Sequence, residues 1–143
     1  MAAIANTQTE RVAFKKIPQA ALFALIPAAV INLVLWFGGA ALSGGQVTGI
    51  PWPAIIIANA ILLIFGSVFF AVLGRFTKRP FIIFTIVAIL FLVIFAFGPI
   101  NAMTTPPSGA ASPLNLITVI ILELQHLVAG AAAIWAFNKY PKA

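Results

Sequence analysis

The chain has 143 residues, of which 63% are hydrophobic and only 7% are charged, so its composition lies outside the range of soluble globular domains. Its net charge of +6 comes from short basic clusters without the long basic stripe that would track a phosphate backbone, which argues against a nucleic-acid partner. The chain has no cysteine, which excludes disulfides, thiolate metal sites and thiol catalysis.

The first apolar run covers about 19–42 and follows an N-terminal segment, 1–18. This run is longer than the core of a signal peptide, roughly 7–15 residues, so we predict an uncleaved spanning helix. The second run, about 51–73, begins Pro-Trp-Pro, and proline suits the first turn of a helix because its missing N–H has no partner there anyway.

The third run, about 80–101, consists almost entirely of Ile, Phe, Val and Leu, so we expect it to face lipid most widely. The fourth, about 113–138, is rich in alanine and is followed by a short tail, 139–143. Each run has the roughly 20 residues that a helix needs to cross about 30 Å of hydrocarbon. The sequence therefore predicts an all-α fold, an integral membrane antiparallel four-helix bundle with one four-transmembrane-helix domain, 19–138.

The basic residues all fall in alternate connections. They precede the first run, join the second to the third, or follow the fourth: Arg11, Lys15, Lys16, Arg75, Lys78, Arg79, Lys139 and Lys142. The remaining connections, 43–50 and 98–113, carry no charged residue. Because Lys and Arg in short loops mark the cytoplasmic side, we expect both termini in the cytoplasm and a multi-pass protein of the bacterial cytoplasmic (inner) membrane.

Four polar residues of three runs form a candidate ligand or proton site. Glu123 is the only acidic residue in any run, and His126, three positions later on a neighbouring position of the same helical face, is the only histidine. Counted from the outer ends of their helices, Asn32, Asn59 and Glu123 lie about 12–15 Å deep, with His126 one turn further in.

An unpaired carboxylate at this depth costs about 2.5–3.5 kcal/mol. We therefore expect a protonated Glu123 that is hydrogen-bonded to Asn32 or Asn59, in preference to an ion pair with His126, because a buried ion pair must offset two desolvation costs. Two interpretations stay open: a site for a proton, an ion or a small ligand, and a hydrogen-bond cluster that fixes the register of the bundle.

Other positions of the fourth run are expected to serve helix packing. Gly130 and Ala133 lie on the face of Glu123 and His126, and small residues let helices approach closely. Gln125 and Thr118 lie on a different face, which we expect at a second interface. The pair of Glu123 and His126 supplies fewer ligands than a zinc site needs, so no metal site is predicted.

Three motifs resemble a family of small, uncharacterised bacterial four-helix integral membrane proteins (a domain of unknown function). They are Arg79-Pro80 before the third helix, Gly98-Pro99 at its end, and the sequence His-Leu-Val-Ala-Gly-Ala at 126–131. The resemblance covers most of the chain and implies the four-helix fold and the membrane location. It places His126 and Gly130 at the family's most recognisable positions and implies no activity.

The leading functional hypothesis is a non-enzymatic accessory or helix-interaction subunit, because four short helices offer little interior volume for catalysis. Its expected partners are membrane lipids, other membrane subunits or further copies of the chain; no catalytic residue and no cofactor are predicted. The alternative is a small transporter or a proton-linked ligand-binding protein that uses Glu123 and His126. A minor alternative is pigment or haem binding through His126, because a single histidine suffices to ligate a chlorophyll magnesium.

Overall fold

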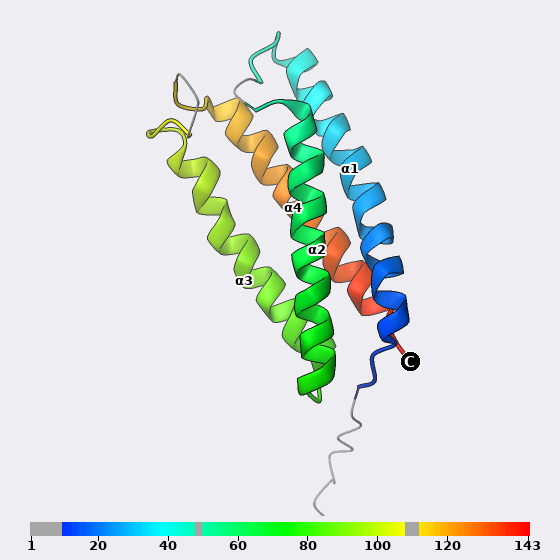
Figure 1. The fold of residues 1–143 in the computed structure, drawn as a ribbon. Helices are drawn as coiled ribbons and strands as arrows, with labels where there is room; N and C mark the ends of the chain where they lie inside the picture. Colours follow the sequence, from blue (N-terminus) through cyan, green and yellow to red (C-terminus); the bar gives the residue numbers. More distant parts are fainter. Residues whose placement is uncertain (1–9, 48–49, 108–111) are drawn as a thin grey trace, which may run out of the picture.

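The computed structural model describes residues 10–47, 50–107 and 112–143. A short 3-10 turn, η1 (Phe14–Lys16), leads into four α-helices: α1 (Ile17–Leu42), α2 (Trp52–Phe76), α3 (Pro80–Asn101) and α4 (Leu116–Lys139). Successive helices run antiparallel, as Figure 1 shows. All four are long and apolar enough to cross a membrane, so the predicted all-α membrane four-helix bundle is confirmed.

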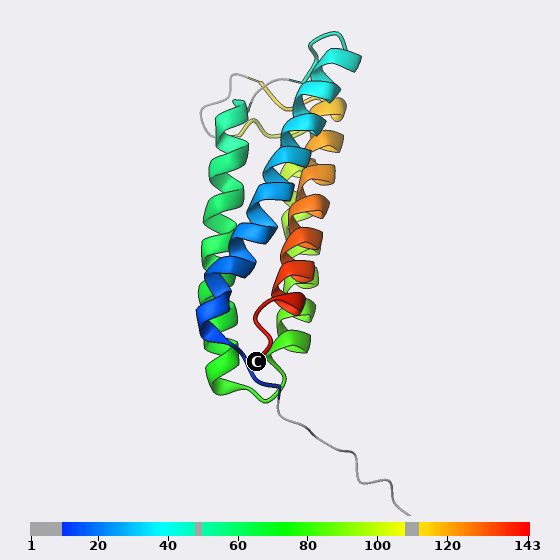
Figure 2. The same ribbon diagram turned by 90° about the vertical axis from the view of Figure 1, so that its right-hand side faces the viewer.

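The helices do not contact one another equally. α1 packs most extensively on α4, and the two lie side by side in Figure 2. α2 packs on α1 and α3 packs on α4, whereas the direct contact between α2 and α3 is small. In Figure 1, α2 and α3 lie close together at the lower end, where a short turn joins them, and move apart towards the upper end.

The two ends of the bundle differ in charge. The basic residues lie at the start of α1, in the α2–α3 turn and at the end of α4, and we call this the basic end. The opposite end, where the chain passes from α1 to α2 and from α3 to α4, is the neutral end. Which end faces the cytoplasm stays a prediction from the distribution of Lys and Arg.

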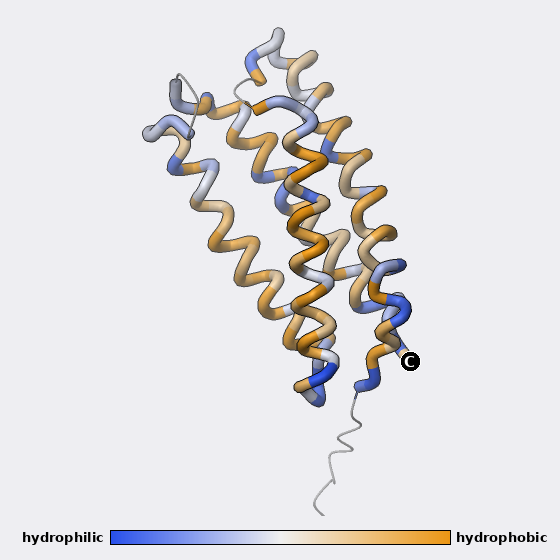
Figure 3. Tube along the Cα trace, in the orientation of Figure 1, coloured by the Kyte–Doolittle hydropathy of each residue, from blue (hydrophilic) through white to orange (hydrophobic). Residues whose placement is uncertain are grey.

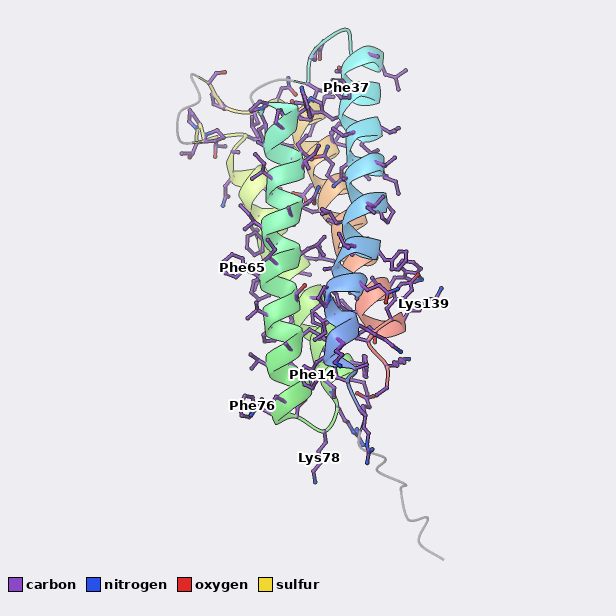
Figure 4. The ribbon with its side chains drawn as sticks, turned by 45° about the vertical axis from the view of Figure 1, so that its right-hand side comes forward. Phe14, Phe37, Phe65, Phe76, Lys78 and Lys139 are labelled. Carbon is purple, nitrogen blue, oxygen red and sulfur yellow. The ribbon has the colours of Figure 1, made fainter. Side chains whose placement is uncertain are left out.

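Hydrophobic residues predominate along the four helices between these ends, as the colouring of Figure 3 shows, and many of their large side chains are exposed. In Figure 4, Phe65 and Phe76 point away from α2, and Lys78 extends from the α2–α3 turn. Phe65 is 67% exposed and Phe76 is 76% exposed. Exposure of such large apolar side chains is unfavourable in water but not in lipid. Only 11% of the most apolar 18-residue stretch of α3 is buried, the smallest share among the four helices. This agrees with the expectation that α3 faces lipid most widely.

The core near the basic end is aromatic. The rings of Phe70 on α2, Phe84 on α3 and Phe137 on α4 form a triangle with centroid distances of 4.9–5.3 Å. Such tilted and edge-on ring contacts add stability beyond the apolar area that they bury. On α1, by contrast, Ala20 and Ala24 are fully buried in the same core, and their small size lets this helix approach its neighbours closely.

The chain segments outside the helices close the basic end. The Ala13 N–H donates to the Pro141 carbonyl (2.7 Å), and Val12 and Lys142 form an isolated antiparallel bridge. A carboxylate oxygen of Glu10 accepts a hydrogen bond from the Phe81 N–H at the start of α3 (3.2 Å), where an acidic group also complements the helix dipole. The expected N-terminal segment and C-terminal tail thus pack against the helices as far as the structure describes them.

The helix bounds differ from the expected ones by a few residues. α4 begins at Leu116, after the expected position 113, because the Asn115 side chain accepts a hydrogen bond from the Thr118 N–H (2.8 Å) and so caps the helix. α2 continues to Phe76, beyond 73, because Arg75 lies in its last turn, where a basic residue complements the helix dipole.

Candidate functional site

A cavity of about 550 Å³ lies between α2, α3 and α4 towards the neutral end, and we call it the interhelical cavity. This volume is within the range of about 300–1,000 Å³ that is usual for small-molecule sites. The cavity exists because aromatic side chains hold α2 and α3 together only near the basic end. Towards the neutral end the facing residues are small: Ala54 and Ala58 on α2 and Gly98 on α3, beside which a Cβ would meet no atom within 4 Å.

The interhelical cavity opens between α2 and α3. Its lining residues Ala58 and Leu62 on α2 and Asn101 on α3 are exposed, whereas the lining residues Asn32 on α1 and Gln125 on α4 are buried. The floor of the cavity is therefore formed by α1 and α4, and its exposed lining residues lie on α2, on α3 and, at Thr105, in the segment that follows α3. The other described lining residues are Ile50, Ala54, Ile55, Asn59, Gly98, Pro99, Ala102, Thr105, Pro107, Leu114, Leu122, His126 and Ala129.

Three of the four predicted site residues, Asn32, Asn59 and His126, line the interhelical cavity. Each has one buried side-chain atom without a hydrogen-bond partner among the described residues: Oδ1 of Asn32, Nδ2 of Asn59 and Nδ1 of His126. Asn32 is 1% exposed and Asn59 is 7% exposed. The three side chains come from three different helices, α1, α2 and α4.

Asn32 is held in place by a fourth polar residue, Gln125. The Gln125 side-chain amide donates to the Asn32 backbone carbonyl (2.9 Å), and the Asn32 side-chain amide donates to the Gln125 backbone carbonyl (3.4 Å). This reciprocal pair joins α1 to α4. Thr118, two turns earlier on the same face of α4, donates from its hydroxyl to the Gln46 carbonyl (3.4 Å), in the segment that follows α1. Gln125 and Thr118 thus contact α1 and the segment after it, on a different side of α4 from Glu123.

Gln125 also lines the interhelical cavity, which sequence reasoning did not anticipate. Its position could have been predicted from depth, because α4 runs antiparallel to α1 and Gln125 lies level with Asn32. Two amide side chains at one depth on adjacent helices are within hydrogen-bonding reach of each other's backbone.

Glu123, the fourth predicted site residue, is not among the residues that line the cavity. Its Oε1 atom is buried without a hydrogen-bond partner, and the expected hydrogen bond to Asn32 or Asn59 is not formed in the described structure. The reason is helical geometry: Glu123 lies about 60° around the α4 axis from His126. That rotation turns Glu123 away from the cavity and towards the side on which Gly130 meets α3.

Gly130 on α4 lies directly against the side chain of Leu92 on α3. A Cβ added at this position would be 2.5 Å from the Leu92 Cδ1 atom, closer than such atoms can lie. Ala133, the other predicted packing residue, is partly buried against the aromatic core. Both small residues thus lie where α4 contacts its neighbours.

The arrangement offers hydrogen bonds, and it does not offer metal ligation. Within the described ranges, no three residues of the types His, Cys, Asp and Glu are grouped closely enough to hold a metal ion. The described lining includes no Lys, Arg, Asp or Glu, so the cavity presents an apolar wall with amide and imidazole groups at its floor. Such a surface suits a ligand that is mostly apolar and carries a few hydrogen-bonding atoms.

The chain belongs to a family of unknown function, DUF6069, whose model matches residues 12–143. The resemblance to an uncharacterised family that the sequence motifs indicated is therefore confirmed. A comparison with curated proteins gave no match, and neither did a comparison with solved structures. Family membership thus supplies no activity, and the function has to be argued from the cavity.

Proposed function

We propose that this small multi-pass membrane protein binds a lipid-soluble small molecule in the interhelical cavity. The observation that carries the proposal is the pair of buried, unpaired amide atoms on its wall, Oδ1 of Asn32 and Nδ2 of Asn59. This is the ligand-binding alternative inferred from the sequence, with Asn32, Asn59 and His126 as the binding groups in place of the pair of Glu123 and His126.

The physical reason is the cost of leaving these atoms unpaired. The great majority of buried polar atoms have a hydrogen-bond partner, and each one without a partner costs about 1–3 kcal/mol. Leucine at position 59 would avoid that cost. A ligand that hydrogen-bonds to Nδ2 of Asn59 and Oδ1 of Asn32 offsets it, so the bound state accounts for two polar atoms that have no partner within the described bundle.

We also propose that the protein is not an enzyme. A catalytic histidine usually has a second group that orients its ring, whereas the Nδ1 atom of His126 has no hydrogen-bond partner in the described structure. The nearby Glu123 does not supply one. His126 is therefore better suited to accept or donate one hydrogen bond to a ligand than to transfer protons during a reaction.

The accessory-subunit hypothesis remains a second candidate, supported by α3. This helix has the smallest buried share of the four, so most of it is free to contact a partner helix or lipid. We place the protein in a bacterial cytoplasmic membrane, with the basic end in the cytoplasm and membrane lipids as its principal surroundings. The clustering of all the Lys and Arg residues at that end supports this orientation.

Ligand binding is tested by extracting small molecules from the purified protein. Ala58, which lines the cavity and is exposed, is replaced by phenylalanine; Ala131, which is exposed on α4 and does not line it, receives the same change as a control. Mass spectrometry of solvent extracts should find a compound in near-stoichiometric amount with the wild type and Ala131→Phe, and much less with Ala58→Phe. Equal extracts from all three would refute the proposal. A visible absorption band would identify the ligand as a pigment or haem.

A further inference from the structure

We infer that the ligand is a neutral amphiphile, with an uncharged, hydroxyl-bearing head bound at Asn32 and Asn59 and an apolar tail that leaves between α2 and α3. This inference rests on the proposed function and names the chemical class of its ligand.

The head is uncharged because the described lining offers no permanently charged group to pair with it, and His126 is its one titratable residue. The described lining holds no Lys or Arg to receive a phosphate or carboxylate, and no Asp or Glu to receive an ammonium group. Glu123, the acidic residue of α4, is not part of the lining. A charged head would lose its hydration without compensation, and at membrane depth that loss exceeds what a few amide hydrogen bonds return.

The unpaired atoms on the wall require both a donor and an acceptor on the head. Nδ2 of Asn59 donates and therefore needs an acceptor, whereas Oδ1 of Asn32 accepts and therefore needs a donor. A hydroxyl group does both. An alkane or a simple ether would leave Asn32 unpaired, so the two atoms together select an alcohol, a phenol or a quinol-like ring.

The tail has a path to lipid along α2. Ala58, Leu62 and Gly66 are spaced four residues apart and so lie on one face of α2; the first two line the cavity, and a Cβ at Gly66 would meet no atom within 4 Å. Towards the basic end the path is closed by the rings of Phe69 and Phe84, whose centroids are 6.4 Å apart. The tail therefore leaves sideways, between α2 and α3.

The test uses probes that share one dodecyl chain with a photoreactive diazirine and differ only at the end group: hydroxyl, phosphate, trimethylammonium or methyl. The protein is reconstituted in lipid nanodiscs, irradiated with each probe over a concentration series, and digested for peptide mapping. We expect the hydroxyl probe to label 54–62 saturably and about tenfold more strongly than either charged probe. Ala58→Phe should abolish this labelling, and Ala131→Phe should leave it unchanged.

A second variant separates head recognition from a loss of the fold. Asn59→Leu should reduce labelling by the hydroxyl probe to the level of the methyl probe, while labelling by the methyl probe itself stays the same. A charged probe that labels the cavity as strongly as the hydroxyl probe would overturn the neutral-head inference and leave ligand binding intact. If no probe labels 54–62 saturably, the inference fails, whereas the proposed function fails only if the extracts also show no difference between Ala58→Phe and the wild type.

Discussion

The substitution Asn59→Leu is expected to stabilise the bundle while it removes ligand binding, a combination that a structural role for Asn59 cannot produce. Asn59 is 7% exposed, and its Nδ2 atom has no hydrogen-bond partner in the described structure. Leucine is similar in length and removes the unpaired amide. The added methyl volume has room, because the side chain lines a cavity of about 550 Å³.

The magnitude follows from the cost of the unpaired group. An unsatisfied buried polar atom costs about 1–3 kcal/mol in soluble proteins. Within membranes the differences are smaller, since interhelical hydrogen bonds average about 0.6 kcal/mol and reach about 1.7 kcal/mol. We therefore expect Asn59→Leu to raise the free energy of unfolding by about 0.5–2 kcal/mol in the absence of ligand.

Gln125→Leu is the matched control, because Gln125 also lines the cavity but uses its side-chain amide within the bundle. This substitution removes the 2.9 Å hydrogen bond to the Asn32 carbonyl. It should lower the free energy of unfolding by about 0.6–1.7 kcal/mol, opposite in sign to Asn59→Leu.

Both variants are measured by unfolding in mixed micelles with increasing mole fractions of sodium dodecyl sulfate, followed by tryptophan fluorescence. The same samples are extracted for bound ligand. If Asn59→Leu destabilises the protein as Gln125→Leu does, Asn59 belongs to a structural hydrogen-bond cluster, and the argument for ligand binding from unpaired amides is refuted.

Three other predictions concern packing, the site and topology. Gly130→Ile should lower the free energy of unfolding by about 1–3 kcal/mol, because the new side chain would overlap the Leu92 side chain of α3. Gly66→Ile should not lower it, because no atom lies within 4 Å of a Cβ at Gly66. Equal thermal denaturation midpoints for the two variants would contradict this prediction. His126→Ala should weaken ligand retention in the extracts, and Glu123→Gln should not, because only the histidine lines the cavity; the reverse order would show that the acidic residue forms the site. The cysteine of a Lys78→Cys variant should react with a membrane-impermeant maleimide in inverted vesicles and stay unlabelled in intact cells. Labelling in intact cells would show that the orientation is the opposite of the predicted one.

The fold could be predicted because its determinants are local. The length and hydropathy of 80–101, for example, specify a spanning helix without knowledge of any neighbour, and the observed α3 has the same bounds. The start of α4 was less predictable. Pro113 suits a first turn, but the cap formed by Asn115 three residues before Thr118 decides where the helix begins.

The site was predicted only in part, because the sequence determines how deep a residue lies in its helix but not how the helix is rotated about its axis. Depth follows from counting residues along each helix, and it predicted one level for Asn32, Asn59 and Glu123, of which the first two line the cavity together with His126. Rotation about the helix axis depends on the neighbours, so Glu123 lies outside the lining and Gln125 lies inside it. The cavity itself reflects an absence of side-chain volume between two helices, which no single segment of sequence encodes.

The closure of the basic end has a consequence for the order in which the molecule is assembled. Lys16 donates to the Lys142 carbonyl across 126 positions (3.2 Å), and Ala143 donates to the Arg11 carbonyl (3.2 Å). The ribosome synthesises Arg11 and Lys16 well before Lys142 and Ala143, so these hydrogen bonds cannot form until α4 has entered the bilayer. A bulky fusion placed directly after Ala143 would therefore hinder them more than one placed in the α3–α4 loop.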